Sequence, residues 1–140
     1  MSRAVDPPAL RLQMECSFAA VRAGAAKLRG FLESNKLAER EIWACELAFV
    51  EGCNNAVQHT PLKLQASGIV VEVILGSAQL ELRINDHTCG CDFPPHVPVP
   101  PPEHERGRGI FLMRTLMDDV AYIRRDSSNC LVLKKAITGI

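Results

Sequence analysis

The chain has 140 residues, of which 47% are hydrophobic and 23% are charged, with sixteen basic and sixteen acidic side chains. This length suits one domain over residues 1–140, and the balanced charge gives no support for binding to nucleic acid or to an anionic membrane surface. No apolar stretch approaches the length of a membrane-spanning helix, and the first residues lack the apolar part of a signal peptide. We therefore expect a cytoplasmic protein with reduced cysteines.

The first half of the chain predicts one strand and two helices. Apolar alternation and helical periodicity give a strand over 10–16, a helix over 18–34 with Ser17 as its N-cap, and a helix over 37–59 ended by Thr60 and Pro61. One side of the second helix is predicted to be a core stripe of Ile42, Cys45, Phe49, Cys53 and Ala56.

The second half predicts two pairs of strands and one more helix. The segments are a hairpin of 67–76 and 78–86 around Gly76 and Ser77, a helix over 107–118, and strands over 119–125 and 129–137. This order predicts an α+β fold, a two-layer sandwich in which helices lie on one face of a mixed, mostly antiparallel sheet.

Residues 87–105 interrupt the regular pattern. They contain six of the nine prolines, which excludes a central strand or a helix interior and favours an extended loop with polyproline character. A loop of this length in a small domain is usually functional or disordered.

Two polar residues share a face of the second predicted helix. Glu51 and Asn55 are four residues apart, so a helix places one above the other, with Gln58 close by. The asparagine oxygen suits Mg²⁺, which takes few protein oxygens beside phosphates, and the carboxylate suits a base that accepts a proton from an attacking hydroxyl. Taken alone, such a pair is common by chance and is better explained as a solvated face of an amphipathic helix.

Two further stretches carry candidate binding groups. Asp86 ends a predicted strand and is followed by Gly90, and a carboxylate there suits an exocyclic amine such as that of adenine. Gly107 and Gly109 stand where a helix begins, so open amide groups would face a phosphate, with Arg106 and Arg108 adding positive charge. The alternatives without a binding role are an ordinary turn at Asp86 and a flexible hinge at Gly107 and Gly109.

Taken in order, three motifs resemble the nucleotide-binding boxes of the GHKL, or Bergerat-fold, ATPases. They are E-x-x-x-N-A-x-x-H from Glu51, D-x-x-x-G from Asp86 and G-R-G-I-F-L-M from Gly107. The resemblance is greatest to the bacterial anti-sigma factor serine kinases, and it extends over nearly the whole chain.

The resemblance implies a kinase that holds ATP and Mg²⁺ between helices and sheet, with the proline-rich loop at about 87–106 as a lid. It implies Glu51 as the catalytic base, Asn55 as the Mg²⁺ ligand and Asp86 as the adenine-binding carboxylate. The other nucleotide-binding residues would be His59, Thr88, Gly90, Arg106, Gly107, Arg108, Gly109 and Ile110. For His59, closure of the helix C-terminus is the alternative role.

The same resemblance implies the protein partners. Members of the family phosphorylate a serine of a small anti-sigma factor antagonist, sequester a sigma factor in an alternate complex, and are usually homodimers. Thr88, however, replaces the first glycine of the usual D-x-G-x-G box, and threonine does not readily take a positive φ. The alternative function is a regulatory module that binds ATP weakly or not at all and acts only by protein binding.

The proline-rich loop also carries five potential metal ligands within eighteen residues: His87, Cys89, Cys91, His96 and His104. Zinc is a minor possibility, because C-x-C is not the usual zinc spacing and prolines restrict convergence. The P-x-x-P pattern in this loop also matches polyproline ligands, although a stiff lid or linker fits a small domain better.

Overall fold

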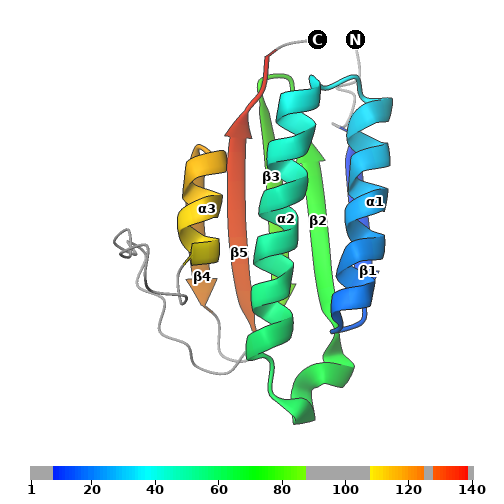
Figure 1. Cartoon of the computed structure of the whole chain (residues 1–140), viewed down its shortest axis with the longest axis vertical. Coiled ribbons are helices and arrows are strands. Elements are labelled where there is room, and N and C mark those ends of the chain that lie inside the picture. The colour runs from blue at the N-terminus through cyan, green and yellow to red at the C-terminus, as the bar shows by residue number, and fades with distance from the viewer. Residues whose placement is uncertain (1–7, 88–107, 125–127, 139–140) are drawn as a thin grey trace, which may run out of the picture.

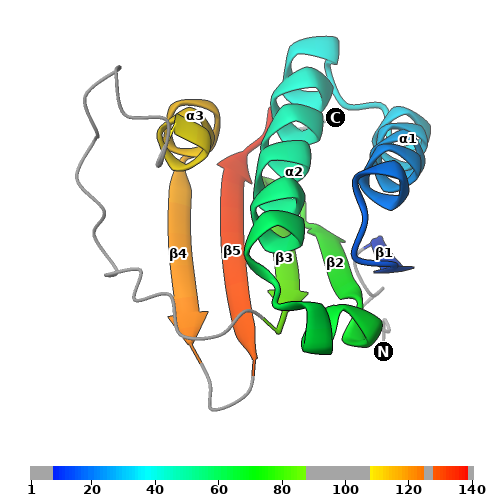
Figure 2. The same ribbon diagram turned by 60° about the horizontal axis from the view of Figure 1, so that its bottom comes forward.

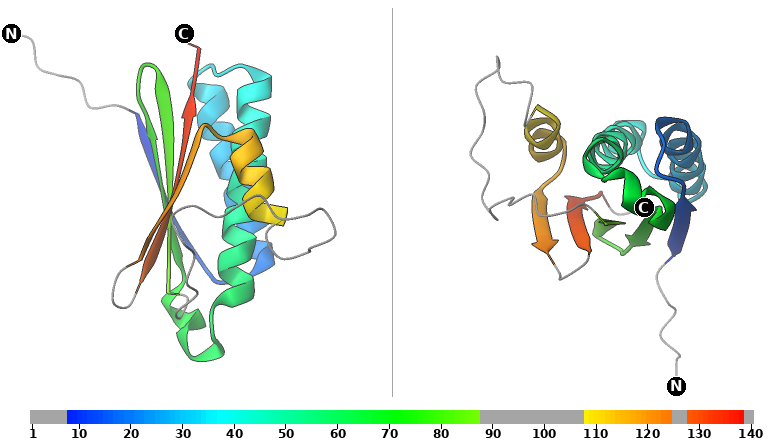
Figure 3. Two further views of the ribbon diagram at one scale, coloured as in Figure 1. Left: turned by 90° about the vertical axis from the view of Figure 1, so that its left-hand side faces the viewer. Right: turned by 90° about the horizontal axis from the view of Figure 1, so that it is seen from below.

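The computed structural model describes residues 8–87, 108–124 and 128–138, and within these residues the chain forms two layers. One layer is a five-stranded sheet in the order β1-β2-β3-β5-β4, in which all neighbours are antiparallel. The other layer consists of helices, which all lie on one face of the sheet, as the edge-on view in Figure 3 shows. The α+β sandwich expected from the order of the elements is confirmed.

Figure 1 shows the elements in chain order. The strands are β1 (Ala9–Met14), β2 (Ile69–Leu75), β3 (Gln79–Asp86), β4 (Asp119–Arg124) and β5 (Asn129–Ala136). The helices are α1 (Phe18–Ser34), α2 (Glu39–His59), α3 (Arg108–Leu116) and the short 3₁₀ helix η1 (Leu62–Ser67). Every predicted strand and helix is present, and the bounds differ from the predicted ones by at most two residues.

The 3₁₀ helix η1 was not predicted. It begins after Pro61 and has six residues, which is too short for a helical period to show in the sequence. It ends at Gly68, whose φ of 71° lies in the left-handed region. A Cβ atom at Gly68 would lie 2.6 Å from the carbonyl oxygen of Met14, so a glycine is required where η1 turns into β2.

The central strands show why the helices cover only one face. In β2, Ile69, Val71, Val73 and Leu75 are buried, and the residues between them are partly exposed. Strand β3 repeats this alternation. Because successive side chains point to opposite faces, the apolar set forms one continuous surface, and the helices pack on it.

The helices bury the stripes that their periodicity predicts. Ser17 is extended and its hydroxyl accepts a hydrogen bond from the Ala20 amide at 3.1 Å, which confirms it as the N-cap of α1. In α2 the predicted core stripe is confirmed, because all five of its residues are at most 2% exposed. Burial raises the pKa of the Cys45 thiol to about 12, so this cysteine is an inert core residue.

Helix α2 is the centre of the helical layer. It contacts α1 on one side and α3 on the other and lies over β3, whereas α1 lies near β1 and α3 near β4 (Figure 2). Among the helices of the described residues, none is long and apolar enough to cross a membrane.

Candidate functional site

The polar face of α2 adjoins a close contact of this helix with the sheet. Glu51 and Asn55 are half-buried, and Gly52 beside them is buried. A Cβ atom at Gly52 would lie 2.7 Å from Ile84 Cδ1 and 3.1 Å from Leu131 Cδ2, closer than packed carbon atoms normally approach. Although glycine costs about 1 kcal/mol of helix propensity, it lets α2 approach β3 and β5 at the level of the polar pair.

The first turn of α3 lies against the same polar face. A Cβ atom at Gly109 would lie 3.0 Å from Glu51 Oε2 and 3.3 Å from Asn55 Nδ2. The absence of a side chain at Gly109 therefore keeps the backbone of α3 close to both groups. The first amides of a helix have no partner within the helix, and the helix dipole makes their surroundings favourable for an anion.

The other end of α3 is attached to β5. Lys135 Nζ donates to the carbonyl oxygen of Leu116 at 2.9 Å, which satisfies an open carbonyl at the helix C-terminus. The Asp118 amide donates to the Lys134 carbonyl oxygen at 2.8 Å, and Asp118 Oδ2 accepts from the Ala136 amide at 2.5 Å. These bonds set the direction of α3 and hence the position of its first turn over α2.

Asp86 ends β3 but is only 4% exposed. Its Oδ1 atom accepts a hydrogen bond from Asn129 Nδ2 at 3.2 Å. Burial raises the pKa of the Cys53 thiol, and the negative charge of Asp86 raises it further. A buried carboxylate requires such polar partners, because removing it from water is costly.

Residues from β3 and α3 thus lie close to α2, and nearly the whole chain is similar to known proteins. The profile of a family described as the histidine kinase-like ATPase domain matches residues 15–135. Serine-protein kinase RsbW from Bacillus thuringiensis (strain Al Hakam) is 31% identical over 121 residues, which cover 80% of this chain and 71% of the relative. The chain belongs to the histidine kinase-like ATPase family. The family inferred from the three motifs is therefore confirmed.

Two solved structures share the fold of this histidine kinase-like ATPase. The structure of the RsbU and RsbW domains of Rv1364c from Mycobacterium tuberculosis matches with a TM-score of 0.73 at 18% identity, over 93% of this chain but 32% of that one. The SiaB–SiaC complex from Pseudomonas aeruginosa matches with a TM-score of 0.61 at 10% identity, over 91% of this chain and 89% of that one.

Asn129 is a polar partner of the candidate site that the sequence did not indicate. In the register of β3 and β5 it lies opposite Asp86, and it is 3% exposed. The sequence marked it only as the first residue of the last strand. The signal that would have found it is the register of these strands, which depends on how the long segment between them folds.

The remaining predicted residues divide into two groups. His59 is exposed in the last turn of α2, where the side-chain donor to a helix carbonyl is Thr60, whose Oγ1 atom lies 2.5 Å from the Ala56 oxygen. Arg108 and Ile110 belong by their backbone to the first turn of α3. The residues outside the described ranges are Thr88, Gly90, Arg106, Gly107 and most of the proline-rich loop.

The cysteine and histidine predictions are tested only in part. In the described residues Cys16, Cys45 and Cys53 are free thiols. Of the five potential zinc ligands in the loop, only His87 falls within the described ranges, and in those ranges no group of three or more metal-binding side chains occurs. The zinc alternative stays a prediction for the loop.

Proposed function

We propose that this histidine kinase-like ATPase is an ATP- and Mg²⁺-dependent serine protein kinase. It would phosphorylate a small anti-sigma factor antagonist and, in an alternate complex, sequester a sigma factor. The observation that carries the proposal is the contact of Gly109 with Glu51 and Asn55. A candidate base, a candidate metal ligand and the start of a helix are adjacent there, and phosphoryl transfer from a nucleotide uses these three groups together.

Glu51 is proposed as the base. The serine hydroxyl of the protein substrate attacks the terminal phosphorus of ATP, a bond forms between the serine oxygen and phosphorus, and the bond to the β-phosphate oxygen breaks to release ADP. The hydroxyl proton passes to the Glu51 carboxylate. Half-burial of this side chain supports the role, because a base in a partly water-excluded site is held in place for the transfer.

Asn55 is proposed as the ligand of Mg²⁺. It offers one neutral oxygen on the face of α2 that meets α3, and this sparse donor set fits an ion that retains most of its waters. When bound, Mg²⁺ would neutralise charge on the phosphates. The residues proposed beside the phosphates are Arg106, Gly107, Arg108, Gly109 and Ile110, with His59 near the end of α2.

Asp86 is proposed to recognise the base of the nucleotide. Its carboxylate accepts hydrogen bonds and would take one from the exocyclic amine of adenine. Thr88 and Gly90 are proposed to flank the base, and the loop at about 87–106 is proposed as the lid. The polar bond to Asn129 supports the role, because it shows that a hydrogen-bonding carboxylate is held inside the fold at the end of β3.

The protein partners are proposed from the relatives. The curated relative is named a serine-protein kinase, and one structure of similar fold is a two-protein complex of SiaB and SiaC. The proposal also includes a homodimer, which the family resemblance implies, and a single domain in a cytoplasmic location, which the length and the apolar pattern of the sequence favour.

The test is phosphoryl transfer from labelled ATP with Mg²⁺ and the cognate antagonist. Glu51→Ala should slow the transfer by about 10²- to 10⁴-fold and leave ATP binding intact. The matched control is Glu46→Ala on the same helix, because Glu46 contacts Arg29 of α1 and lies away from α3. Unchanged transfer in Glu51→Ala would refute the role of Glu51.

A second candidate function is a binding module that acts without catalysis. It is favoured by Thr88, which replaces the first glycine of the adenine-binding box. Titration calorimetry with Mg-ATP distinguishes the two. Binding at micromolar nucleotide supports the kinase, and absence of binding at millimolar nucleotide leaves only the module.

A further inference from the structure

Helix α3 is short, and its C-terminal end is attached to the sheet. Met113 in the helix and Met117 just after it are at most 4% exposed and belong to the core. Leu116 and Asp118 form the described hydrogen bonds that link this end of α3 to β5. A helix of nine residues is marginal by itself, so these attachments determine where the whole of α3 lies.

Lys135 is the side chain that the sheet contributes to this attachment. It lies opposite Leu80 in the β3–β5 register, and because Leu80 is 0% exposed, Lys135 is on the helix-covered side of β5. Its Nζ atom donates to the carbonyl oxygen of Leu116 at 2.9 Å. A cation at this end of a helix is favoured by the open carbonyl and by the helix dipole.

The opposite end of α3 faces the candidate site. In the first turn, a Cβ atom at Gly109 would lie 3.0 Å from Glu51 Oε2 and 3.3 Å from Asn55 Nδ2. A base must reach the hydroxyl that attacks the terminal phosphorus, so helix amides beside Glu51 would lie near the terminal phosphate. The first turn of α3 would therefore meet the charge by which ATP differs from ADP.

The length of α3 makes its attached end important for the other end. At 1.5 Å per residue, the nine residues of α3 span about 12 Å, so a tilt of about 5° at Leu116 moves the first turn by about 1 Å. A misplacement of about 1 Å is enough to slow a reaction by about 10²-fold. The bond from Lys135 to Leu116 can therefore affect groups that Lys135 does not contact.

We infer that Lys135 is a positioning residue that holds α3 so that the site prefers a nucleoside triphosphate to a diphosphate. The inference rests on the proposed function, in which Glu51 and Asn55 act at the terminal phosphate. Lys135 acts through the backbone of α3 and not by contact with the nucleotide. Without its ammonium group, α3 would lose a bond to β5, and its first turn would occupy a range of positions over α2.

The experiment measures the affinities of the whole chain for Mg-ATP and Mg-ADP by calorimetry, and the transfer rate at saturating ATP. Lys135→Met keeps the apolar stem of the side chain but removes the donor. It should lower the ATP to ADP affinity ratio by about tenfold and slow the transfer by about tenfold or more. Lys135→Arg should restore both quantities, because a guanidinium also donates to a carbonyl.

The matched control is Lys134→Met. Lys134 is the preceding residue of β5 and points to the other face of the sheet, where its Nζ atom lies 3.8 Å from Glu81 Oε1. Its loss should change neither the affinity ratio nor the transfer rate. Thermal unfolding of each variant checks the fold. If Lys135→Met does not fold, Lys135→Gln, which is shorter and uncharged, decides by the same fall in the ratio.

The possible failures are distinguishable. If the wild-type protein binds neither nucleotide, the proposed function fails and the inference fails with it. If the wild-type protein binds both and the uncharged Lys135 variants keep its affinity ratio and rate, the proposed function stands and the inference is overturned. An equal loss of ATP and ADP affinity also overturns it, because it shows a purely structural role for Lys135.

Discussion

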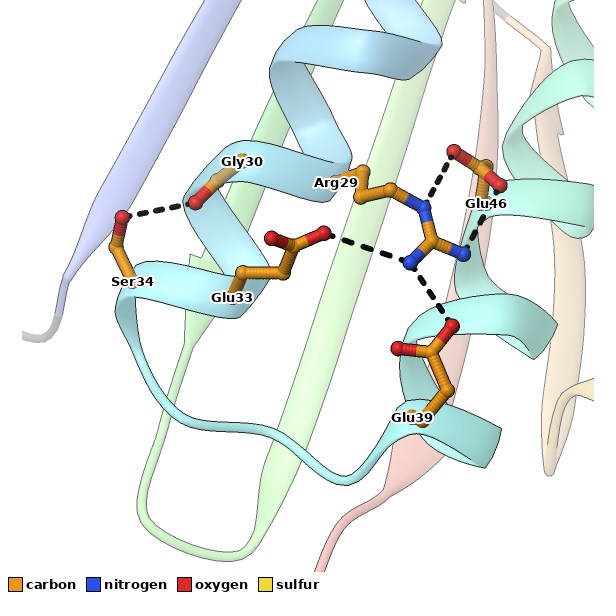
Figure 4. Close-up of polar contacts among 6 residues, drawn as sticks. All are labelled: Arg29, Gly30, Glu33, Ser34, Glu39 and Glu46. Carbon is orange, nitrogen blue, oxygen red and sulfur yellow. Dashed lines mark hydrogen bonds and ion pairs between the residues drawn. The ribbon is translucent and has the colours of Figure 1, made fainter.

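A glutamate lies on each flank of α2, and the surroundings of the two side chains differ. On the α1 side, Glu46 accepts from Arg29 Nε at 3.1 Å, and Arg29 also contacts Glu39 at 2.9 Å and Glu33 at 3.4 Å (Figure 4). On the α3 side, the Glu51 carboxylate lies beside the backbone of Gly109, and in the described residues it forms no ion pair. One glutamate holds two helices together, whereas the other is half-buried and has no cationic partner among the residues that the structure describes.

This difference indicates that the α1 flank stabilises the fold, whereas the α3 flank carries the candidate site. The carboxylates around Arg29 raise its pKa, so the guanidinium stays charged at any pH at which the protein is folded. A half-buried carboxylate beside helix amides gains no comparable partner in the described residues. Sites that carry function commonly accept such unfavourable arrangements, since stability is supplied elsewhere. Three predictions test the contrast.

The largest effect is expected at Gly109. In Gly109→Ala the new methyl group would lie 3.0 Å from Glu51 Oε2 and would displace the end of that side chain, so the fold should survive and the reacting group should move. A displacement of this kind should slow phosphoryl transfer by about 10²-fold. Initial rates with labelled ATP measure the effect.

The control for Gly109→Ala is Gly30→Ala on α1. Nothing lies within 4 Å of a Cβ atom at Gly30, which is exposed, so the change should raise the free energy of unfolding by about 0.5–1 kcal/mol through helix propensity. Its transfer rate should equal that of the wild type. Equal rates in both variants would show that Gly109 does not limit the position of Glu51.

A smaller effect is expected at the two buried helix glycines. Gly24→Ala would press on the Met14 sulfur and on the Phe49 ring, and Gly52→Ala on Ile84 and Leu131. Each overpacked methyl group should lower the free energy of unfolding by about 1–3 kcal/mol, as measured by denaturant titration. Only Gly52→Ala should also weaken Mg-ATP binding, because only Gly52 adjoins the polar face. Equal ATP affinities in the two variants would contradict this distinction.

The smallest effect is expected for Arg29→Met. The Arg29 side chain is 29% exposed and Glu39 is 73% exposed, so solvent and salt screen these ion pairs. Melting temperature should fall slightly at low salt, and the difference from the wild type should shrink as salt is added. Transfer rates should not change. A large loss of activity would mean that the α1 flank of α2 also belongs to the site.

Much of the fold was predictable because its signals are local. Ser17 and the apolar period of residues 18–34 determine α1, and the alternation in β2 and β3 determines which face is buried. The 3₁₀ helix after Pro61 was missed because it is too short to show a period. The motif resemblance identified the family, since the order of three motifs is far more specific than any one of them.

The site itself was predictable only in part. A spacing of four residues places Glu51 and Asn55 on one face of a helix in any protein, so the sequence alone determined that pair. The contact of Gly109 with Glu51, the close approach at Gly52 and the bond from Asn129 to Asp86 were decided by tertiary structure. Their physical reason is the same: each joins residues distant in sequence, and strand register and helix packing determine which distant residues meet.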